Sequence, residues 1–172
     1  MNKTNKKTLY IVHSALIAAL YAAVTYFCAP ISFGSLQFRV SEALTILPVL
    51  SPAAIPGLTI GCLISNLSSP YGLIDIICGT AATLLAAICS RWTRNIRFKN
   101  MPLLSALFPV IFNGIIIGLE IAFLLPEGFS WMAFASIGAS VAFGEIVVCY
   151  ILGLPLFAAL NKAKVFKNWS SK

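Results

Sequence analysis

Acidic and amide side chains are the residues of this sequence that could do chemistry, because they interrupt stretches that are otherwise apolar. Four carboxylates and two amides lie in or beside such stretches: Glu42, Asp75, Glu120, Glu145, Asn66 and Asn113. A carboxylate at the centre of a bilayer costs about 3 kcal/mol or more, so it normally has a partner and a function. By their depth in the predicted helices, these side chains line a binding cavity that opens towards the outside.

Most of these residues also have a structural interpretation. The alternatives are a helix-dipole role for Asp75, an ion pair with Arg39 for Glu42, an end cap for Asn66, an interhelical hydrogen bond for Asn113 and a position at the outer interface for Glu120. Glu145 is the hardest to explain in this way, because mid-membrane it reaches water only through a cavity. We therefore favour a functional role for Glu145, and the role of Glu120 stays open.

The charge balance indicates the kind of ligand. Counting Glu120, four carboxylates face one guanidinium, Arg39, across the outer half of the predicted bundle. Unpaired buried carboxylates are costly, so the cavity should prefer a cation or a solute rich in N–H donors. A proton-coupled carrier would also use buried carboxylates, so this pattern leaves both kinds of transporter open.

Other kinds of chemistry find little support. The five cysteines lie within apolar runs without a Cys-x-x-Cys pair, and His13 is the single histidine, so we expect buried small hydrophobic side chains and no metal site. His13 lies at the start of the first helix, away from the carboxylates, and no glycine-rich phosphate loop is present. We expect no enzyme and no cofactor; ATP for active transport would be hydrolysed by partner subunits.

The elements that must position these residues are membrane helices. The 172 residues are 59% hydrophobic and 10% charged, with a mean hydropathy of +0.93, whereas soluble domains carry about 25% charged residues. At roughly 20 apolar residues per span, the length allows about six helices. The sequence predicts an all-α membrane protein with a single integral membrane domain, residues 1–172, and a six-helix bundle at residues 9–29, 40–50, 53–67, 74–92, 102–125 and 131–160.

Details of the helices follow from their lengths and prolines. The helices at 40–50 and 53–67 would reach only about 16–23 Å, less than the roughly 30 Å hydrocarbon core, so we expect a protein-lined region or a partly re-entrant hairpin. Pro155 is expected to kink the last helix. The stretch 9–29 is long enough to span and lacks a small-x-small cleavage site, so we predict a retained first helix.

Basic residues predict the orientation. Eleven of the twelve fall in three clusters beside apolar segments: Lys3, Lys6 and Lys7; Arg91, Arg94, Arg97 and Lys99; Lys162, Lys164, Lys167 and Lys172. The positive-inside rule places these clusters in the cytoplasm, and six crossings then place both termini there. We expect a multi-pass protein of the cell membrane. Lipid headgroups and solvent explain the clusters, so no nucleic acid is expected.

Small residues recur at four-residue spacing and predict close helix packing. The pairs Gly57/Gly61 and Gly114/Gly118 are expected to pack within this bundle. The ladder Ala15, Ala19 and Ala23 is ambiguous, because the outward face of a first helix is available to a partner.

Five segments resemble the queuosine-precursor transporter family, whose members are substrate-capture (S) components of energy-coupling factor (ECF) transporters. They are residues 38–45 (FRVSEALT), 52–57 (PAAIPG), 61–66 (GCLISN), 73–80 (LIDIICGT) and 144–155 (GEIVVCYILGLP). The first helix is also similar to the Ala-x-x-x-Ala element of such components, at Ala15 and Ala19. The resemblance extends from this helix to Pro155.

The resemblance implies a six-helix bundle that binds its substrate near the outer face, beneath a lid formed by the loop after the first helix. It implies a transmembrane coupling (T) subunit and two cytoplasmic ATPase subunits as partners. The implied substrate is a 7-deazaguanine, 7-aminomethyl-7-deazaguanine or a close analogue. The residues agree with this substrate, because its aminomethyl group is cationic and its guanine-like edge offers two N–H donors to a carboxylate.

Carried over by position, the implied substrate-binding residues are Arg39, Glu42, Asn66, Asp75, Glu145 and, as a weaker match, Asn113. The implied docking residues for the coupling subunit are Ala15 and Ala19. Two alternatives remain: an S component for another vitamin-like heterocycle, and a non-transport membrane scaffold whose carboxylates are interhelical contacts. A binding assay on the purified chain separates these possibilities.

Overall fold

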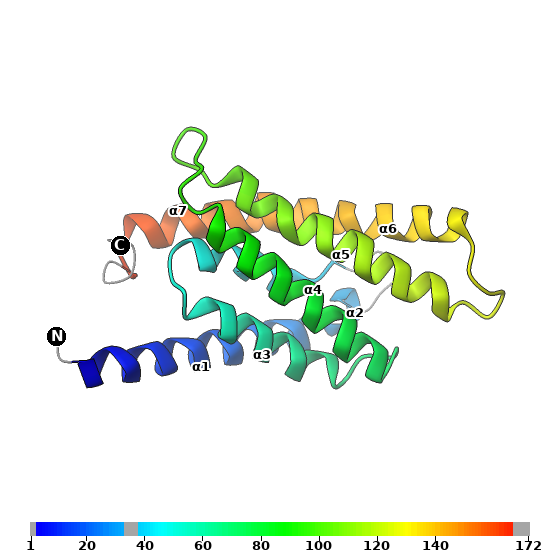
Figure 1. Cartoon of the computed structure of the whole chain (residues 1–172), viewed down its shortest axis with the longest axis horizontal. Helices are drawn as coiled ribbons and strands as arrows, with labels where there is room; N and C mark the ends of the chain where they lie inside the picture. The colour runs from blue at the N-terminus through cyan, green and yellow to red at the C-terminus, as the bar shows by residue number, and fades with distance from the viewer. Residues whose placement is uncertain (1–2, 33–37, 167–172) are drawn as a thin grey trace.

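The protein is a bundle of helices that run along one long axis (Figure 1). The computed structural model describes residues 3–32 and 38–166, in which every regular element is a helix apart from an isolated bridge between Phe98 and Met101. The elements are α1 (Lys3–Phe27), α2 (Ala29–Ser32), η1 (Val40–Val49), α3 (Ala54–Asn66), α4 (Leu73–Trp92), α5 (Leu103–Leu124), α6 (Trp131–Ile146), η2 (Val147–Gly153) and α7 (Leu154–Lys162). The all-α prediction is confirmed for the described residues.

Four helical regions are long and apolar enough to cross a bilayer. They are Lys6–Phe27, Leu73–Trp92, Leu103–Leu124 and Trp131–Lys162, the last combining α6, η2 and α7. The two remaining apolar helices, η1 and α3, have 10 and 13 residues and are shorter than a span, as expected. This combination is typical of a multi-pass membrane protein.

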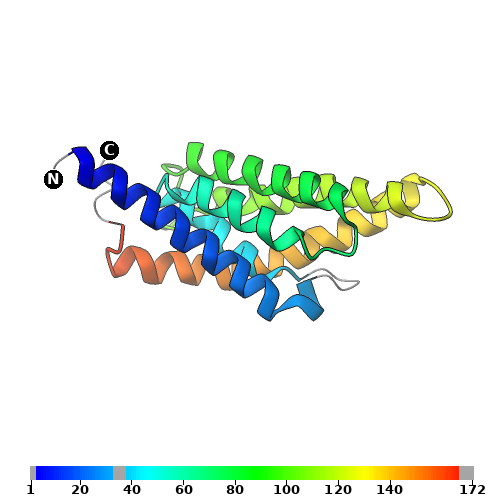
Figure 2. The same cartoon turned by 90° about the horizontal axis from the view of Figure 1, so that it is seen from below.

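The long helices pack in chain order, with η1 among them. α1 lies along one side of the bundle against α3, while α5 and α6 form the opposite side (Figures 1 and 2). α4 lies between these two sides. η1 contacts α1, α3, α4 and α5, and it packs on η2, the segment that continues α6. Polar side chains of α1, α3, α4 and α5 that point towards η1 can therefore meet in the interior.

Glycines permit the close approach of the helices, as the sequence predicts. A Cβ at Gly61 of α3 would lie 2.8 Å from Tyr21 Cβ of α1, and one at Gly118 of α5 would lie 2.8 Å from the Cα of Gly138 in α6. Contacts this short exclude any larger residue without a shift of the backbone. The two glycine pairs pack within the bundle, whereas Ala15, Ala19 and Ala23 are exposed on the outer face of α1.

The segment η1 is a 3-10 helix rather than an α-helix. Pro48 lies inside it, has no N–H to donate, and would clash with the carbonyl four residues earlier in an α-helix. The Glu42 carbonyl accepts the Thr45 hydroxyl at 2.6 Å and faces the Cys149 thiol at 3.7 Å. These two contacts give the Glu42 carbonyl additional donors within a ten-residue 3-10 helix, which is long for this conformation.

The last long helix is irregular just before Pro155, where the sequence predicts a kink. The segment η2 is π-helical and ends at Gly153, and Pro155 follows in the first turn of α7. A Cβ at Gly153 would lie 3.2 Å from the carbonyl oxygen of Ala43, so η2 packs closely on η1. The two irregular helices therefore lie against each other in the middle of the bundle.

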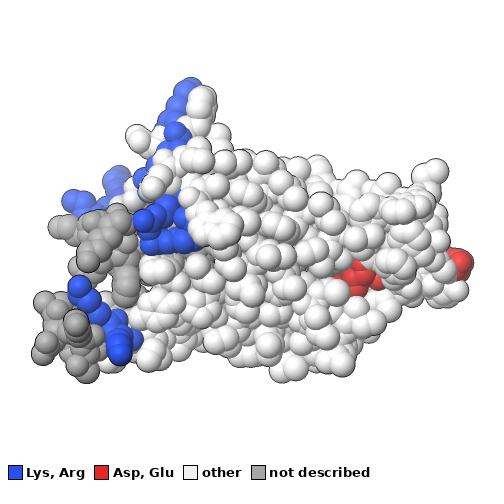
Figure 3. All heavy atoms as spheres, viewed as in Figure 1, with Lys and Arg blue, Asp and Glu red and all other residues white. Residues whose placement is uncertain are grey.

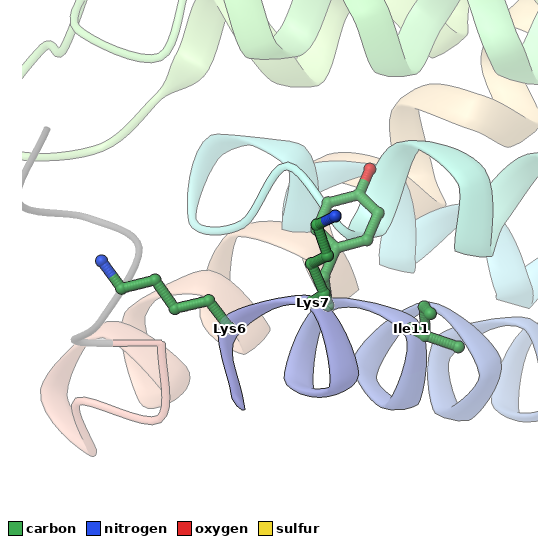
Figure 4. Close-up of a pocket in the computed structure, with 4 residues that line it drawn as sticks. Lys6, Lys7 and Ile11 are labelled. Atoms are coloured by element: carbon green, nitrogen blue, oxygen red, sulfur yellow. The ribbon is translucent and has the colours of Figure 1, made fainter. Parts of the chain in front are cut away.

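Charge separates the two ends of the molecule. Basic side chains gather at the end that carries the start of α1, the α4–α5 connection and the end of α7, and acidic ones lie in the other half (Figure 3). At the basic end, Lys6, Lys7, Tyr10 and Ile11 line a shallow groove of about 350 Å³, from which the two lysine side chains diverge (Figure 4). This groove therefore lies at the end of the molecule opposite the acidic residues.

Candidate functional site

A first polar cluster joins η1, α3 and α4. The guanidinium of Arg39, the residue before η1, lies 3.9 Å from the Asp75 carboxylate in the first turn of α4. Asn66, the last residue of α3, donates its side-chain N–H to the backbone carbonyl of Asp75 at 3.0 Å. Three residues that are distant in the sequence are thus fixed against one another at the end of the α3–α4 pair.

Gly79 is a fourth member of this cluster that the sequence analysis did not single out. A Cβ at this position would overlap the Asn66 amide and would lie 3.2 Å from Asp75 Oδ1 and 3.5 Å from Arg39 Nη1. The missing side chain therefore leaves the room in which the guanidinium, the carboxylate and the amide meet. Its position one turn after Asp75 on the same helix face was the available signal.

A second cluster surrounds Glu42, which is completely buried. Its Oε1 atom accepts hydrogen bonds from the Tyr21 hydroxyl of α1 and, at 3.1 Å, from the Thr83 hydroxyl of α4. Neither Tyr21 nor Thr83 was predicted from the sequence as a site residue. For Tyr21 a signal existed, since membrane tyrosines gather at the interfaces and this one lies well inside an apolar helix.

The third cluster joins α5 to α6 and η2. Glu145 accepts a hydrogen bond from the Asn113 side-chain amide at 3.0 Å, and its other oxygen faces the Cys149 thiol at 3.5 Å. Glu145 lies within electrostatic range of both Glu42 and Arg39. The second and third clusters therefore form one buried acidic region beside a single guanidinium.

All six predicted site residues are buried, none more than 7% exposed. Three of them nevertheless have an acceptor without a partner among the described residues: Glu42 Oε2, Asn66 Oδ1 and Asn113 Oδ1. A buried acceptor left in this state costs about 1–3 kcal/mol, and native proteins rarely retain several of them together. These oxygens come from η1, α3 and α5, and N–H donors are the groups that would satisfy them.

Several structural alternatives can now be compared with the geometry. The carboxylate of Glu42 bonds to Tyr21 and Thr83, and the ion pair that Arg39 makes in the structure is with Asp75. Asn66 bonds across to α4 and so does not cap its own helix. Asn113 does make the interhelical hydrogen bond of its structural alternative, and its partner is a site carboxylate.

The Glu120 side chain is buried, which does not support the alternative that it extends to the outer interface. Glu120 is 5% exposed, and both of its carboxylate oxygens are buried inside the bundle. The expected lid, residues 31–39, has its central part, residues 33–37, outside the described residues. Within the described ranges no three His, Cys, Asp or Glu side chains are grouped as metal ligands.

Comparison with known proteins shows the family to which this chain belongs. A family model described as the QueT transporter matches residues 11–162, which include every residue of the three clusters. The chain belongs to the QueT transporter family. This is a family of transporters, so the chain is a membrane transport protein rather than an enzyme. No solved structure matches the chain.

A curated relative within the same family is similar over part of the chain. The queuosine precursor transporter QueT of Lactococcus lactis subsp. cremoris (strain MG1363) is 42% identical over 81 residues. The match covers 46% of this chain and 47% of the relative, so it spans about half the length of each protein. The resemblance seen in the sequence segments is thereby confirmed at the level of the family.

Proposed function

We propose that this chain is the substrate-capture (S) subunit of an ECF-type importer and that it binds 7-aminomethyl-7-deazaguanine or a close analogue. The observation that carries the proposal is the set of three buried acceptors without partners, Glu42 Oε2, Asn66 Oδ1 and Asn113 Oδ1. A guanine-like edge presents adjacent N–H donors, which a carboxylate and an amide oxygen can accept together.

Charge supports the same ligand. The region holds the carboxylates of Glu42, Asp75 and Glu145, and Arg39 is the guanidinium beside them. A neutral ligand would leave this excess of negative charge in a medium of low dielectric constant, which is costly. A ligand that carries one ammonium group reduces the excess, and the aminomethyl deazaguanine carries one.

The proposed orientation places the basic end in the cytoplasm, which follows from the positive-inside rule. The polar clusters then lie in the outer half of the cell membrane, where a captured solute enters. In this arrangement the short η1–α3 hairpin completes the six-helix bundle with the four long regions. Both termini are cytoplasmic whether or not the hairpin crosses the bilayer.

The proposed partners are a transmembrane coupling subunit and two cytoplasmic ATPase subunits, because the chain has no phosphate-binding loop of its own. The exposed Ala15 and Ala19 on α1 support a docking face for the coupling subunit. Small residues let the backbones of two membrane helices approach closely. This face is remote from the carboxylates. Glu42 contacts the opposite, buried face of α1 through Tyr21.

A binding assay on the purified full chain in detergent tests the proposal. We expect tight binding of the aminomethyl deazaguanine without any partner subunit, and binding of its neutral cyano analogue weaker by about tenfold or more, the value of one charge-assisted hydrogen bond. Riboflavin is the control heterocycle. Preference for riboflavin would favour an S component of other specificity, and binding of no heterocycle in a wider panel would refute the substrate-capture role.

A further inference from the structure

Glu120 is a buried carboxylate that the hydrogen-bond network leaves unused. It lies in α5, is 5% exposed, and neither of its oxygens has a hydrogen-bond partner among the described residues. An unpaired carboxylate in this position is expensive in protein or lipid. A residue that only supported the fold would be expected to have found a donor.

The position of Glu120 on α5 relates it to the proposed site. It follows Asn113 by seven residues, two helical turns, so both side chains lie on the same inward face, separated by about 10 Å along the axis. Asn113 is 2% exposed and contacts Glu145. Glu120 therefore lies on the continuation of the site towards the end of the bundle opposite the basic residues.

Glu120 has charged residues in its surroundings and an apolar groove beside it. The nearby charged side chains are Asp75 and Arg39, both members of the first cluster. The groove, of about 320 Å³, lies between α4 and α5, and its other lining residues are Ile74, Cys78, Ile116, Leu119, Phe123 and Leu124. A polar group that satisfies Glu120 is therefore expected from the direction of the first cluster.

We propose that Glu120 binds the cationic substituent of the substrate and so determines the preference for an aminomethyl over a neutral substituent. This inference rests on the proposed function. In a guanine-like bicycle the amide edge and the substituent at position 7 project in different directions. The unpartnered oxygens of Glu42, Asn66 and Asn113 accept the N–H groups of the amide edge. Glu120, further along α5, binds the ammonium group.

Glu120 therefore has a different task from Glu145. Glu145 already accepts the Asn113 amide, and its second oxygen faces Cys149. Both Glu120 oxygens are available to accept hydrogen bonds from an ammonium group, which has three N–H donors. The unpartnered oxygens of Glu42, Asn66 and Asn113 recognise the N–H edge that all deazaguanines share, and Glu120 recognises the substituent that distinguishes them.

The test compares Glu120→Gln with wild type on two ligands, the aminomethyl and the cyano deazaguanine, using the purified full chain. We expect the variant to lose about tenfold or more in affinity for the aminomethyl ligand, because a charge-assisted hydrogen bond is removed. The affinity for the cyano ligand should stay within about twofold. Glu127→Gln, which changes an exposed loop carboxylate, is the matched control and should alter neither affinity.

Equal losses for both ligands, or no loss for either, would overturn the inference while leaving the proposed function intact. A wild-type chain that binds neither deazaguanine would overturn the proposed function itself, and the inference with it. Glu120→Met, similar in length and without charge, is the second variant. The ligand-free unfolding midpoints of both variants should equal or exceed that of wild type, since an unpaired charge is removed. If neither variant folds, Glu120 supports the fold and the inference is wrong.

Discussion

Replacement of Glu145 by glutamine should weaken substrate binding far more than the same change at Glu127. Glu145 is 4% exposed and lies beside Asn113 and Cys149, whereas Glu127 lies in the exposed turn between α5 and α6. Glutamine keeps the size of the side chain and keeps an oxygen that can accept the Asn113 amide. The change therefore removes the charge and replaces the second acceptor oxygen with an N–H donor.

The magnitude follows from the bond that is lost. Under the proposed function, a substrate N–H donor takes the place of the Cys149 thiol at the second oxygen of Glu145. Such a hydrogen bond to a charged group contributes about 1.5–3 kcal/mol, and each 1.4 kcal/mol is a factor of ten, so the affinity should fall by about 10-fold to 150-fold. At Glu127 the carboxylate lies in water, and the expected change is within about 0.5 kcal/mol, or roughly twofold. The two variants thus differ by about one order of magnitude or more.

Calorimetric titration of the two purified variants with the aminomethyl deazaguanine measures this difference directly. Unfolding midpoints recorded on the same preparations show whether the Glu145 variant retains its fold. Equal affinities for the two folded variants would remove Glu145 from the substrate site. The acidic residue in the middle of the last long helix would then have to be explained by helix packing alone.

Two further changes test other parts of the arrangement. Gly79→Ala should lower substrate affinity and cost about 1–3 kcal/mol of stability, because the added Cβ overlaps the Asn66 amide and crowds Asp75. Unchanged titrations and melting curves would show that the space left by the missing side chain is not needed. Ala19→Trp should leave substrate affinity nearly unchanged while abolishing copurification with the coupling subunit and uptake by cells, because a bulky residue keeps a partner helix away. Loss of affinity and copurification together would defeat the docking proposal.

Much of the fold could be predicted from the sequence because a bilayer imposes length and apolarity on each span. The ends of α4 and α5 lie within one residue of the predicted ranges. Burial of the isolated carboxylates could also be predicted, because exposing a charge to lipid is costly and a carboxylate within a membrane helix therefore faces the interior. Depth along each helix was then sufficient to place Asn66 and Asp75 at the same end of the bundle.

The partners of these residues could not be predicted, because contacts between helices depend on rotation and register. The sequence offered Arg39 as a partner for Glu42 by the i, i+3 rule of an α-helix. Arg39 instead precedes a 3-10 helix, and Tyr21 and Thr83 approach Glu42 from other helices. The direction in which the Glu120 side chain faces could not be predicted for a similar reason, since the distance of a residue from the interface says nothing about which way its side chain points.

The η1–α3 hairpin connects the two ends of the molecule. At its open end it carries Glu42, and at its closed end it is anchored near the basic residues, where Ser14 donates to the Ala53 carbonyl at 2.9 Å and Arg91 donates to the Pro48 carbonyl at 3.0 Å. Both arms are helical, and the connection between them is only a few residues long. We therefore expect a displacement of the closed end to move Glu42 as well. In the proposed orientation the closed end faces the cytoplasm, so a force applied there would reach the proposed substrate site through this hairpin.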